Sequence, residues 1–194
     1  MPSCITCGNG AARQLVSGRR FRPLRSNAMN ARRPVSGTCS LDTSLGTLGM
    51  RWTHGRLRRL WFYNVSAPPP PSPASLAGEP VVQRTIGALR AYFRRPAAFP
   101  RLPLAPEGTS FQQRVWRALC AIPPGQSRCY GELARSLGTG SRAVGGACRA
   151  NPIPILIPCH RVVAATGTGG YSQGLARKDW LLRHEGHEGI PRFV

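Results

Sequence analysis

Acidic residues are scarce in this sequence: 7 Asp and Glu oppose 27 Lys and Arg, which gives a formal net charge of +20. Lysine is nearly absent too, because Lys178 is the single lysine and the other members of that basic set are arginines. Such a charge indicates a polyanionic partner, since counterion release favours phosphate backbones and arginine adds bidentate contacts. An arginine-rich coding bias would raise the charge equally well, so composition leaves both explanations open.

Long apolar runs and paired cysteines are also missing. No stretch of about 18 apolar residues occurs, so the sequence predicts no membrane-spanning helix. The 7 cysteines are odd in number, irregularly spaced and not preceded by a hydrophobic signal segment, which favours a reducing, cytoplasmic setting. Cys4 and Cys7 have the spacing of half a zinc site, but no second pair follows at a finger-like distance. We therefore expect no metal and no cofactor.

Composition divides the chain into three regions. Residues 1–38 carry arginines but no acid and little apolar periodicity, so we expect a disordered basic arm. A targeting peptide, or an upstream start codon with Met29 as the alternative beginning, would leave the same pattern. Residues 39–105 are expected to form a small N-terminal domain. Residues 106–194 are expected to form the domain that carries the chemistry.

In the N-terminal domain, short apolar segments on either side of His54-Gly55 predict a β-hairpin. A hairpin alone is only marginally stable in water and needs another element packed against its apolar face. The segment PVVQRTIGALRAYF can supply it, because its apolar residues Val82, Ile86, Leu89 and Phe93 recur at helical spacing. The run APPPPSPAS cannot join a ladder or a helix, so we interpret it as a loop and spacer rather than an SH3 ligand.

Three short helices are predicted in the C-terminal domain. The first begins at a capping box on Thr109 and ends before a pair of prolines. The second ends at Gly138, and the third runs from Ser141 to Asn151, which precedes a proline. Two short helices joined by a tight glycine-containing turn predict a helix-turn-helix.

Gly145 and Gly146 lie in the middle of the third predicted helix, where each glycine costs about 1 kcal/mol relative to alanine. With Ala143, Ala147 and Ala150 they form a nearly bare ridge beside Arg142 and Arg149, on which a nucleic-acid backbone could lie. Close packing of two helices through these small residues is the alternative. The charge of the chain favours docking to DNA.

The segment NPIPILIPCHRVV places Cys159 directly before His160, after an aliphatic run that we expect to be buried and extended. A thiol with a pKa of about 8.5 is mostly protonated at neutral pH, so a nucleophilic cysteine needs a base. His160 is adjacent, but neighbouring side chains of a strand point to opposite faces, so contact requires a bend or a bridging water. Glu185 is the expected acid that orients His160.

A fourth helix is predicted over LARKDWLLRHE, which ends at Glu185. A glycine-rich loop, ATGTGGYSQG, lies between Cys159 and this helix. Its glycines allow it to fold closely over a flat ligand. Tyr171 and Ser172 supply an aromatic face and a hydroxyl there.

The segments RAVGGACRANPIPILI, PCHRVV and GGYSQGLARKDWLLRHEG resemble those of the O6-alkylguanine-DNA alkyltransferases, also called methylated-DNA-protein-cysteine methyltransferases. The similarity is continuous from Thr109 to Gly186, and TSLGTLGMRW and LAPEGTSFQQRVW are similar to further segments of that family. The resemblance implies an α/β, ribonuclease-H-like N-terminal domain. It also implies a mainly α, winged-helix-like C-terminal domain that contains the helix-turn-helix.

The resemblance also implies an activity, which is DNA repair. Members of this family flip O6-alkylguanine out of duplex DNA and transfer its alkyl group irreversibly to a cysteine, here Cys159, in a single turnover. His160 would act through a water with Glu185 orienting it, and Asn151 and Arg161 would brace them. The implied partner is double-stranded DNA that contains O6-alkylguanine, with O4-alkylthymine as a second candidate, bound by a monomer away from membranes.

The resemblance assigns roles around the flipped base. Arg142 would enter the base stack, and Tyr130 would crowd the adjacent phosphate. Val162, Tyr171 and Ser172 would surround the base, with Ser172 on its O6 side. The residues that it implies for DNA contact are Tyr130, Arg142, Ala143, Gly145, Gly146 and Arg149. Lys178 also occupies a position of the family pattern.

Two other classes of protein use some of the same residues. A cysteine hydrolase would employ Cys159, His160 and Glu185, but it would need an oxyanion hole and a water path, and the helix-turn-helix would have no role. A DNA-binding regulator or an inactive damage sensor would explain the charge and the helices. It would leave the thiol and Glu185 without a function.

Overall fold

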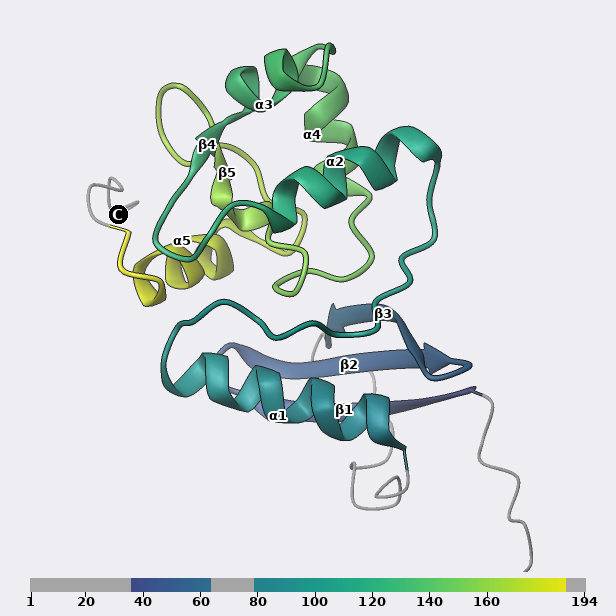
Figure 1. The fold of residues 1–194 in the computed structure, drawn as a ribbon. Coiled ribbons are helices and arrows are strands. Elements are labelled where there is room, and N and C mark those ends of the chain that lie inside the picture. The colour runs from purple at the N-terminus through teal and green to yellow at the C-terminus, as the bar shows by residue number, and fades with distance from the viewer. Residues whose placement is uncertain (1–35, 64–78, 188–194) are drawn as a thin grey trace, which may run out of the picture. The chain divides into compact units, whose positions relative to one another are not determined.

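The computed structural model describes residues 36–63 and 79–187 of the chain (Figure 1). The predicted basic arm, the proline run and the Cys4 and Cys7 pair lie outside the described residues. Every described residue belongs to one compact unit. No helix in this described part has the length and apolar character that crossing a membrane requires.

Three antiparallel strands open the described part: β1 (Ser36–Thr43), β2 (Gly46–Thr53) and β3 (Arg56–Phe62), in the order β1-β2-β3. The predicted hairpin is confirmed. His54 and Gly55 connect β2 to β3 with φ angles of 50° and 67°, as a two-residue turn with positive φ at both positions requires. Strand β1 pairs with β2 from Ser36 onward, so the expected boundary between arm and domain at residue 39 was placed too late.

Helix α1 (Pro80–Arg94) packs against this sheet (Figure 1). It begins with a proline, which is tolerated there because the first N–H groups of a helix have no intrahelical partner. The predicted residues Val82, Ile86 and Leu89 are buried. Tyr92 rather than Phe93 completes the buried face, since Tyr92 is 2% exposed and Phe93 is only partly buried.

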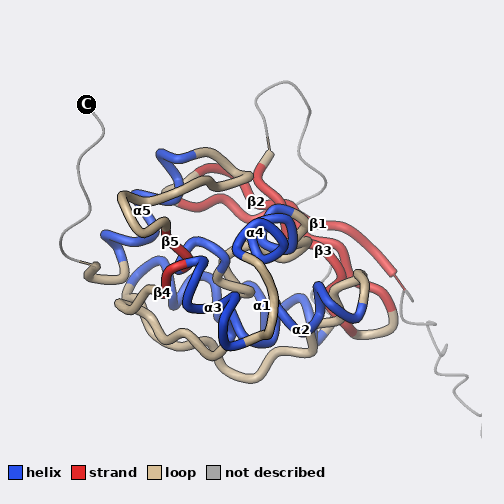
Figure 2. The backbone as a smooth tube through the Cα atoms, turned by 90° about the horizontal axis from the view of Figure 1, so that it is seen from above, coloured by secondary structure: helices blue, strands red, loops and turns tan. Residues whose placement is uncertain are grey.

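Four helices follow, each at a place that the sequence predicts: α2 (Ser110–Cys120), α3 (Tyr130–Ser136), α4 (Ser141–Arg149) and α5 (Leu175–His184) (Figure 2). The capping box of α2 is present, because Gln112 N donates to Thr109 Oγ1 and Thr109 N donates to Gln112 Oε1. Gly138 follows α3 with a φ of 63°, the conformation that favours glycine after a helix. Two short strands, β4 (Arg128–Cys129) and β5 (Val162–Val163), pair in parallel.

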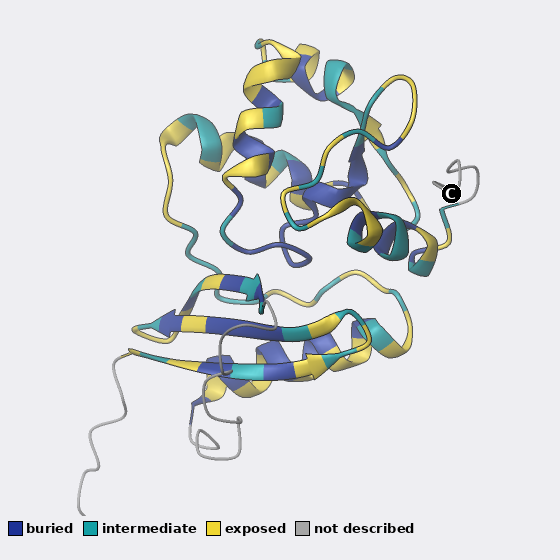
Figure 3. Ribbon diagram, turned by 180° about the vertical axis from the view of Figure 1, so that it is seen from behind, coloured by how far each residue is buried: buried dark blue, intermediate teal, exposed yellow. Residues whose placement is uncertain are grey.

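The aliphatic run before Cys159 is buried, as predicted, but it is not extended (Figure 3). It forms turns in which Ile157 N donates to Ile153 O and Ile155 adopts a φ of 70°. Prolines at positions 152, 154 and 158 remove the N–H donors that a strand needs to pair, so the run closes on itself. The segment after it, Cys159–Arg161, is a 3₁₀ turn, so the alternation of a strand does not apply to Cys159 and His160.

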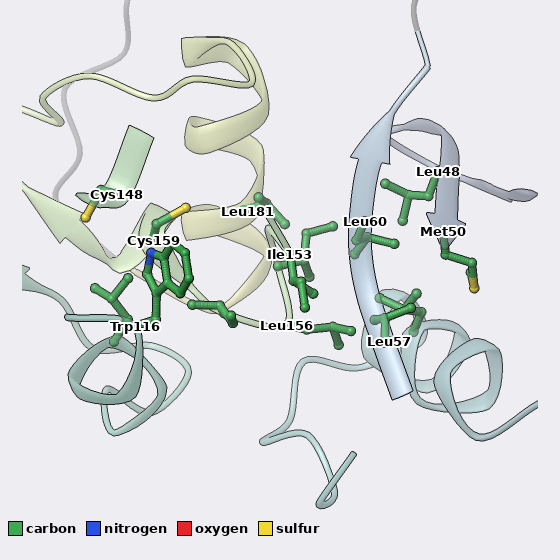
Figure 4. Close-up of a cluster of buried hydrophobic side chains, with 14 of the residues drawn as sticks. Leu48, Met50, Leu57, Leu60, Trp116, Cys148, Ile153, Leu156, Cys159 and Leu181 are labelled. Carbon is green, nitrogen blue, oxygen red and sulfur yellow. The ribbon is translucent and has the colours of Figure 1, made fainter. Parts of the chain in front are cut away.

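The buried run lies against the sheet. Figure 4 shows Ile153 and Leu156 on the side that faces Leu57 and Leu60 of β3. Leu60 N donates to Pro152 O at 2.9 Å, which fixes the start of the run against the strand. On the other side, Trp116 of α2 donates from Nε1 to a backbone oxygen of α4 at 2.9 Å. The described part is therefore a mixed α/β fold in which the sheet and the helices share one core around the segment that leads to Cys159.

Candidate active site

Cys159 begins the 3₁₀ turn and is 3% exposed. Asn151 holds this thiol, because its Nδ2 donates to Cys159 Sγ at 3.1 Å and to Ile157 O at 2.8 Å. Ile153 N donates to Asn151 Oδ1, which fixes the orientation of the amide. Burial raises the pKa of Cys159 to about 11, although the hydrogen bond from Asn151 and the charge of Lys178 oppose the rise. The resting thiol is therefore protonated, and reaction requires a base.

A buried network lies behind His160. Its Nε2 is 3.0 Å from Glu185 Oε1. Arg161 donates two hydrogen bonds to the same carboxylate, from Nε to Oε2 at 2.9 Å and from Nη2 to Oε1 at 2.7 Å. Its third nitrogen, Nη1, donates to Ile122 O. Burial by itself raises the pKa of Glu185, but hydrogen bonds from His160 and Arg161 outweigh burial and lower it to about 2. Glu185 is thus an ionised carboxylate.

The network fixes the tautomer of His160. An ionised carboxylate only accepts hydrogen bonds, so His160 donates from Nε2 to Glu185. Burial lowers the pKa of His160 and outweighs the opposite effect of Glu185, so the imidazole is neutral and Nδ1 carries no proton. Within residues 36–63 and 79–187, His160 Nδ1 is buried without a hydrogen-bond partner. His160, which follows Cys159 in sequence, therefore has an unprotonated Nδ1 whose lone pair is not used by another described residue.

A cavity of about 1010 Å³ opens beside Cys159. Residues of α3, α4 and the loop before α5 line it, including Tyr130, Arg142, Gly145, Gly146, Arg149, Tyr171 and Ser172. Of the residues predicted for DNA contact and for the base pocket, two are not among its lining. Ala143 is exposed on α4, and Val162 is fully buried in β5. Cys148 also lines the cavity, although no motif marks it.

The two glycines of α4 face open space. A Cβ atom built on Gly145 or Gly146 meets no atom within 4 Å. Close packing between helices therefore does not explain these glycines, and that alternative is wrong. The packed side of α4 consists instead of Val144, Ala147 and Cys148, which are buried. Ala147 was expected on the bare ridge, but its position on the helix turns it toward the core. The bare ridge is available to a large ligand that approaches the cavity.

Lys178 anchors the loop before α5. It is fully buried, and its Nζ donates to the backbone oxygens of Val162 (2.7 Å), Thr168 (2.6 Å) and Gly170 (3.1 Å). Burial lowers its pKa to about 8. The sequence placed Lys178 in a family pattern without a definite role. The structure shows that it fixes the wall that carries Tyr171 and Ser172.

Sequence reasoning missed one residue of the network. Tyr92 of α1 donates its hydroxyl to Glu185 Oε1 at 2.7 Å, across 93 positions of the sequence. No motif marks it, because a tyrosine on an amphipathic helix is ordinarily a packing residue. Among the described residues, no group of three or more His, Cys, Asp or Glu side chains could hold a metal ion.

Comparisons with known proteins give a consistent result. Residues 110–187 match a family model described as 6-O-methylguanine DNA methyltransferase, DNA binding domain. The chain is 54% identical over 94 residues to the methylated-DNA–protein-cysteine methyltransferase of Salmonella typhimurium, covering 47% of this chain and 55% of that protein. The chain thus spans about half the length of that curated relative.

Solved structures extend the similarity to most of the described chain. The O6-methylguanine methyltransferase of Mycobacterium tuberculosis is 34% identical, with a TM-score of 0.67, over 77% of this chain and 92% of that one. A structure of the protein from the same organism in complex with DNA is 36% identical, with a TM-score of 0.65, over 76% of this chain and 91% of that one. These similarities include the sheet region as well as the helices.

Proposed function

Because the chain belongs to the 6-O-methylguanine DNA methyltransferase family, we propose that it repairs duplex DNA by transferring the alkyl group of O6-alkylguanine to its own Cys159. One observation carries the proposal: the thiol of Cys159 borders a cavity and is followed by His160, whose Nδ1 is free and whose Nε2 is held by Glu185. The complex of the Mycobacterium tuberculosis protein with DNA supports DNA as the partner.

We further infer the finer architecture. The three-stranded sheet with α1 supports a ribonuclease-H-like N-terminal domain, and α3 and α4 with the Gly138 turn support a winged-helix-like helix-turn-helix. The alkyl-acceptor domain begins near residue 106 and contains every residue assigned to the chemistry from sequence. We expect the protein to act in a reducing cytoplasm, in which a free thiol persists. We also expect it to bind DNA as a monomer.

The transfer step follows from the network. His160 Nδ1 takes the proton of Cys159 through a water, and the Glu185 carboxylate stabilises the imidazolium that results. The thiolate sulfur attacks the alkyl carbon, the S–C bond forms and the C–O6 bond breaks. The electron pair of that bond passes to the guanine, which takes up the proton and leaves. The product is a thioether, which has no good leaving group, so each molecule acts once.

The cavity fits a base that has left the helix. Enzymes that react with a base in duplex DNA rotate it out of the stack into a pocket. Here Tyr171 and Ser172 form one wall, and Ser172 supplies a hydroxyl for the O6 side. Arg142 lies exposed at the cavity, where it can fill the gap in the stack. Tyr130 donates from its hydroxyl to Gly170 O, which joins α3 to the wall.

The measurement that tests the proposal is the intact mass of the protein after mixing with duplex DNA that contains O6-methylguanine. We expect a gain of about 14 Da, the mass of a methyl group in place of a hydrogen, on Cys159. The control is the same duplex with unmodified guanine, which should leave the mass unchanged. Release of many alkyl groups per protein without an adduct would indicate a cysteine hydrolase. Binding without any chemical change would indicate a damage sensor.

Arg142→Ala is expected to reduce alkyl transfer by about 10–100-fold, because base extrusion costs a few kcal/mol and Arg142 would hold the gap open. Affinity for undamaged duplex should fall only about two- to fivefold, since one phosphate contact among many is lost. The two quantities are measured as single-turnover rates and as binding curves at several salt concentrations. The matched control is Arg90→Ala, because Arg90 is an exposed arginine of α1. This substitution should change the transfer rate and the affinity for undamaged duplex only slightly. Equal losses in rate and affinity for Arg142→Ala would show only a phosphate contact.

A further inference from the structure

We propose that Tyr92, on α1 of the N-terminal region, is a positioning residue for alkyl transfer. Its hydroxyl holds the Glu185 carboxylate against His160 and reduces the negative charge that this carboxylate presents to His160. The inference rests on the proposed transfer to Cys159. It assigns part of the reaction to a segment in which the sequence shows no chemical motif.

Glu185 Oε1 is the meeting point of three donors. Tyr92 donates from its hydroxyl at 2.7 Å, His160 from Nε2 at 3.0 Å and Arg161 from Nη2 at 2.7 Å. Tyr92 and Glu185 are only 2% and 6% exposed, so water does not compete for these contacts. Burial and the adjacent carboxylate raise the pKa of Tyr92 far above its ordinary value. Tyr92 therefore remains a neutral donor over the whole pH range in which Glu185 is ionised.

The ring of Tyr92 has no freedom to turn away from Glu185. Phe99 stacks on it with ring centroids 4.9 Å apart and an interplanar angle of 30°. His184 of α5 meets the Tyr92 ring edge to face, with ring centroids 5.3 Å apart. Its Nε2 lies 2.7 Å from the backbone oxygen of Tyr92. The packing thus places the hydroxyl on the carboxylate, and the hydroxyl restrains the carboxylate in return.

The hydroxyl changes the chemistry of His160 through Glu185. A donor on Oε1 draws negative charge toward itself, so less of that charge stabilises a proton on His160. The other ionisable groups that act on His160 are Arg161 and Lys178, which disfavour its charged form, while Tyr171 lies near Cys159 and Glu185. Tyr92 works in the same direction as the two cations. It helps to keep His160 neutral, which is the form able to accept the proton of Cys159.

The test is Tyr92→Phe in the full chain. This substitution removes one oxygen and retains the ring that packs on Phe99 and His184, so the protein should remain folded. Without the hydroxyl, Glu185 stabilises protonated His160 more strongly. The midpoint of the His160 titration, followed by NMR, should move to higher pH by about 0.5–1 pH unit. The acidic limb of the rate of alkyl transfer should move with it. At pH 7 the rate should fall by at most about threefold, because the native pKa of His160 lies below its ordinary value, and it should recover toward the native value at higher pH.

Val82→Ala is the matched control, because it loosens the core packing of the same helix ten residues away from Tyr92. It should lower the melting temperature and leave the His160 titration and the shape of the rate profile unchanged. If Tyr92→Phe leaves the titration of His160 where it is, or only lowers stability as Val82→Ala does, the inference is wrong. The titration does not require activity. A shifted midpoint in a protein that transfers no alkyl group would therefore overturn the proposed function and leave the link from Tyr92 to His160 intact.

Discussion

Cys159→Ser is expected to abolish alkyl transfer while leaving the fold and the binding of undamaged DNA unchanged. Serine is close to cysteine in size, and Asn151 can donate to its hydroxyl as it does to the thiol. A serine hydroxyl stays protonated near neutral pH and is a far poorer nucleophile than a thiolate. The number of bases repaired is measured by titrating protein against an excess of duplex with O6-methylguanine. The native chain should reach a plateau of about one base per protein, and the variant should repair none.

Cys120→Ser is the control for a general effect of losing a thiol, because Cys120 is exposed at the end of α2 and lies outside the cavity. It should retain the native plateau. Peptide mapping of the alkylated chain should place the adduct on Cys159 and not on Cys148, which lines the same cavity. A native plateau well above one, repair by Cys159→Ser, or an adduct on Cys148 would each contradict the mechanism.

Arg161→Met is expected to lower the free energy of unfolding by about 3–5 kcal/mol, the usual cost of removing one member of a buried ion pair. Arg161 has 5% of its side chain exposed and Glu185 has 1%, so the carboxylate left behind has little access to water. The variant also leaves Ile122 O without its guanidinium donor. Urea unfolding of the native and variant chains measures the difference.

The comparison for Arg161→Met is Arg183→Met, because Arg183 pairs with Asp179 within α5 but has 47% of its side chain exposed. Its loss should cost at most about 1 kcal/mol. Adding Glu185→Gln to Arg161→Met should recover part of the lost stability, since the unpaired charge is then removed. If Arg161→Met costs no more than Arg183→Met, the carboxylate is not held as a buried ionised group.

The elements that the sequence predicted correctly carry local signals. The capping box at Thr109, the turn at His54-Gly55 and the glycine at position 138 each act within a few residues, and each is present in the structure. The run before Cys159 is different. Its aliphatic composition is typical of a buried strand, but three prolines and the positive φ of Ile155 turn it, and no local pattern distinguishes these outcomes.

The site was predictable to the extent that its residue types have characteristic chemistry. A cysteine beside a histidine, with a distant acid, indicates a nucleophile, a base and an orienting group. The structure places Glu185 within hydrogen-bonding distance of His160, as predicted. The role of each residue in the reaction stays a prediction. Tyr92 could not be predicted, because its contribution depends on a contact between α1 and the end of α5 that only the tertiary fold creates. Val162 was expected in the pocket wall, but pairing in β5 directs it into the core.

The burial of Lys178 has a consequence for the surface chemistry of the whole protein. It is the single lysine of the chain, and in the fold its amine is enclosed and bonded to three backbone oxygens. Reagents and enzymes that modify lysine amines, by acylation, alkylation or conjugation, therefore find no accessible lysine on the folded molecule. The positive charge that the protein presents to its surroundings is carried by guanidinium groups, which such reagents do not attack. A lysine adduct on this chain would mark a molecule that had opened its loop before α5.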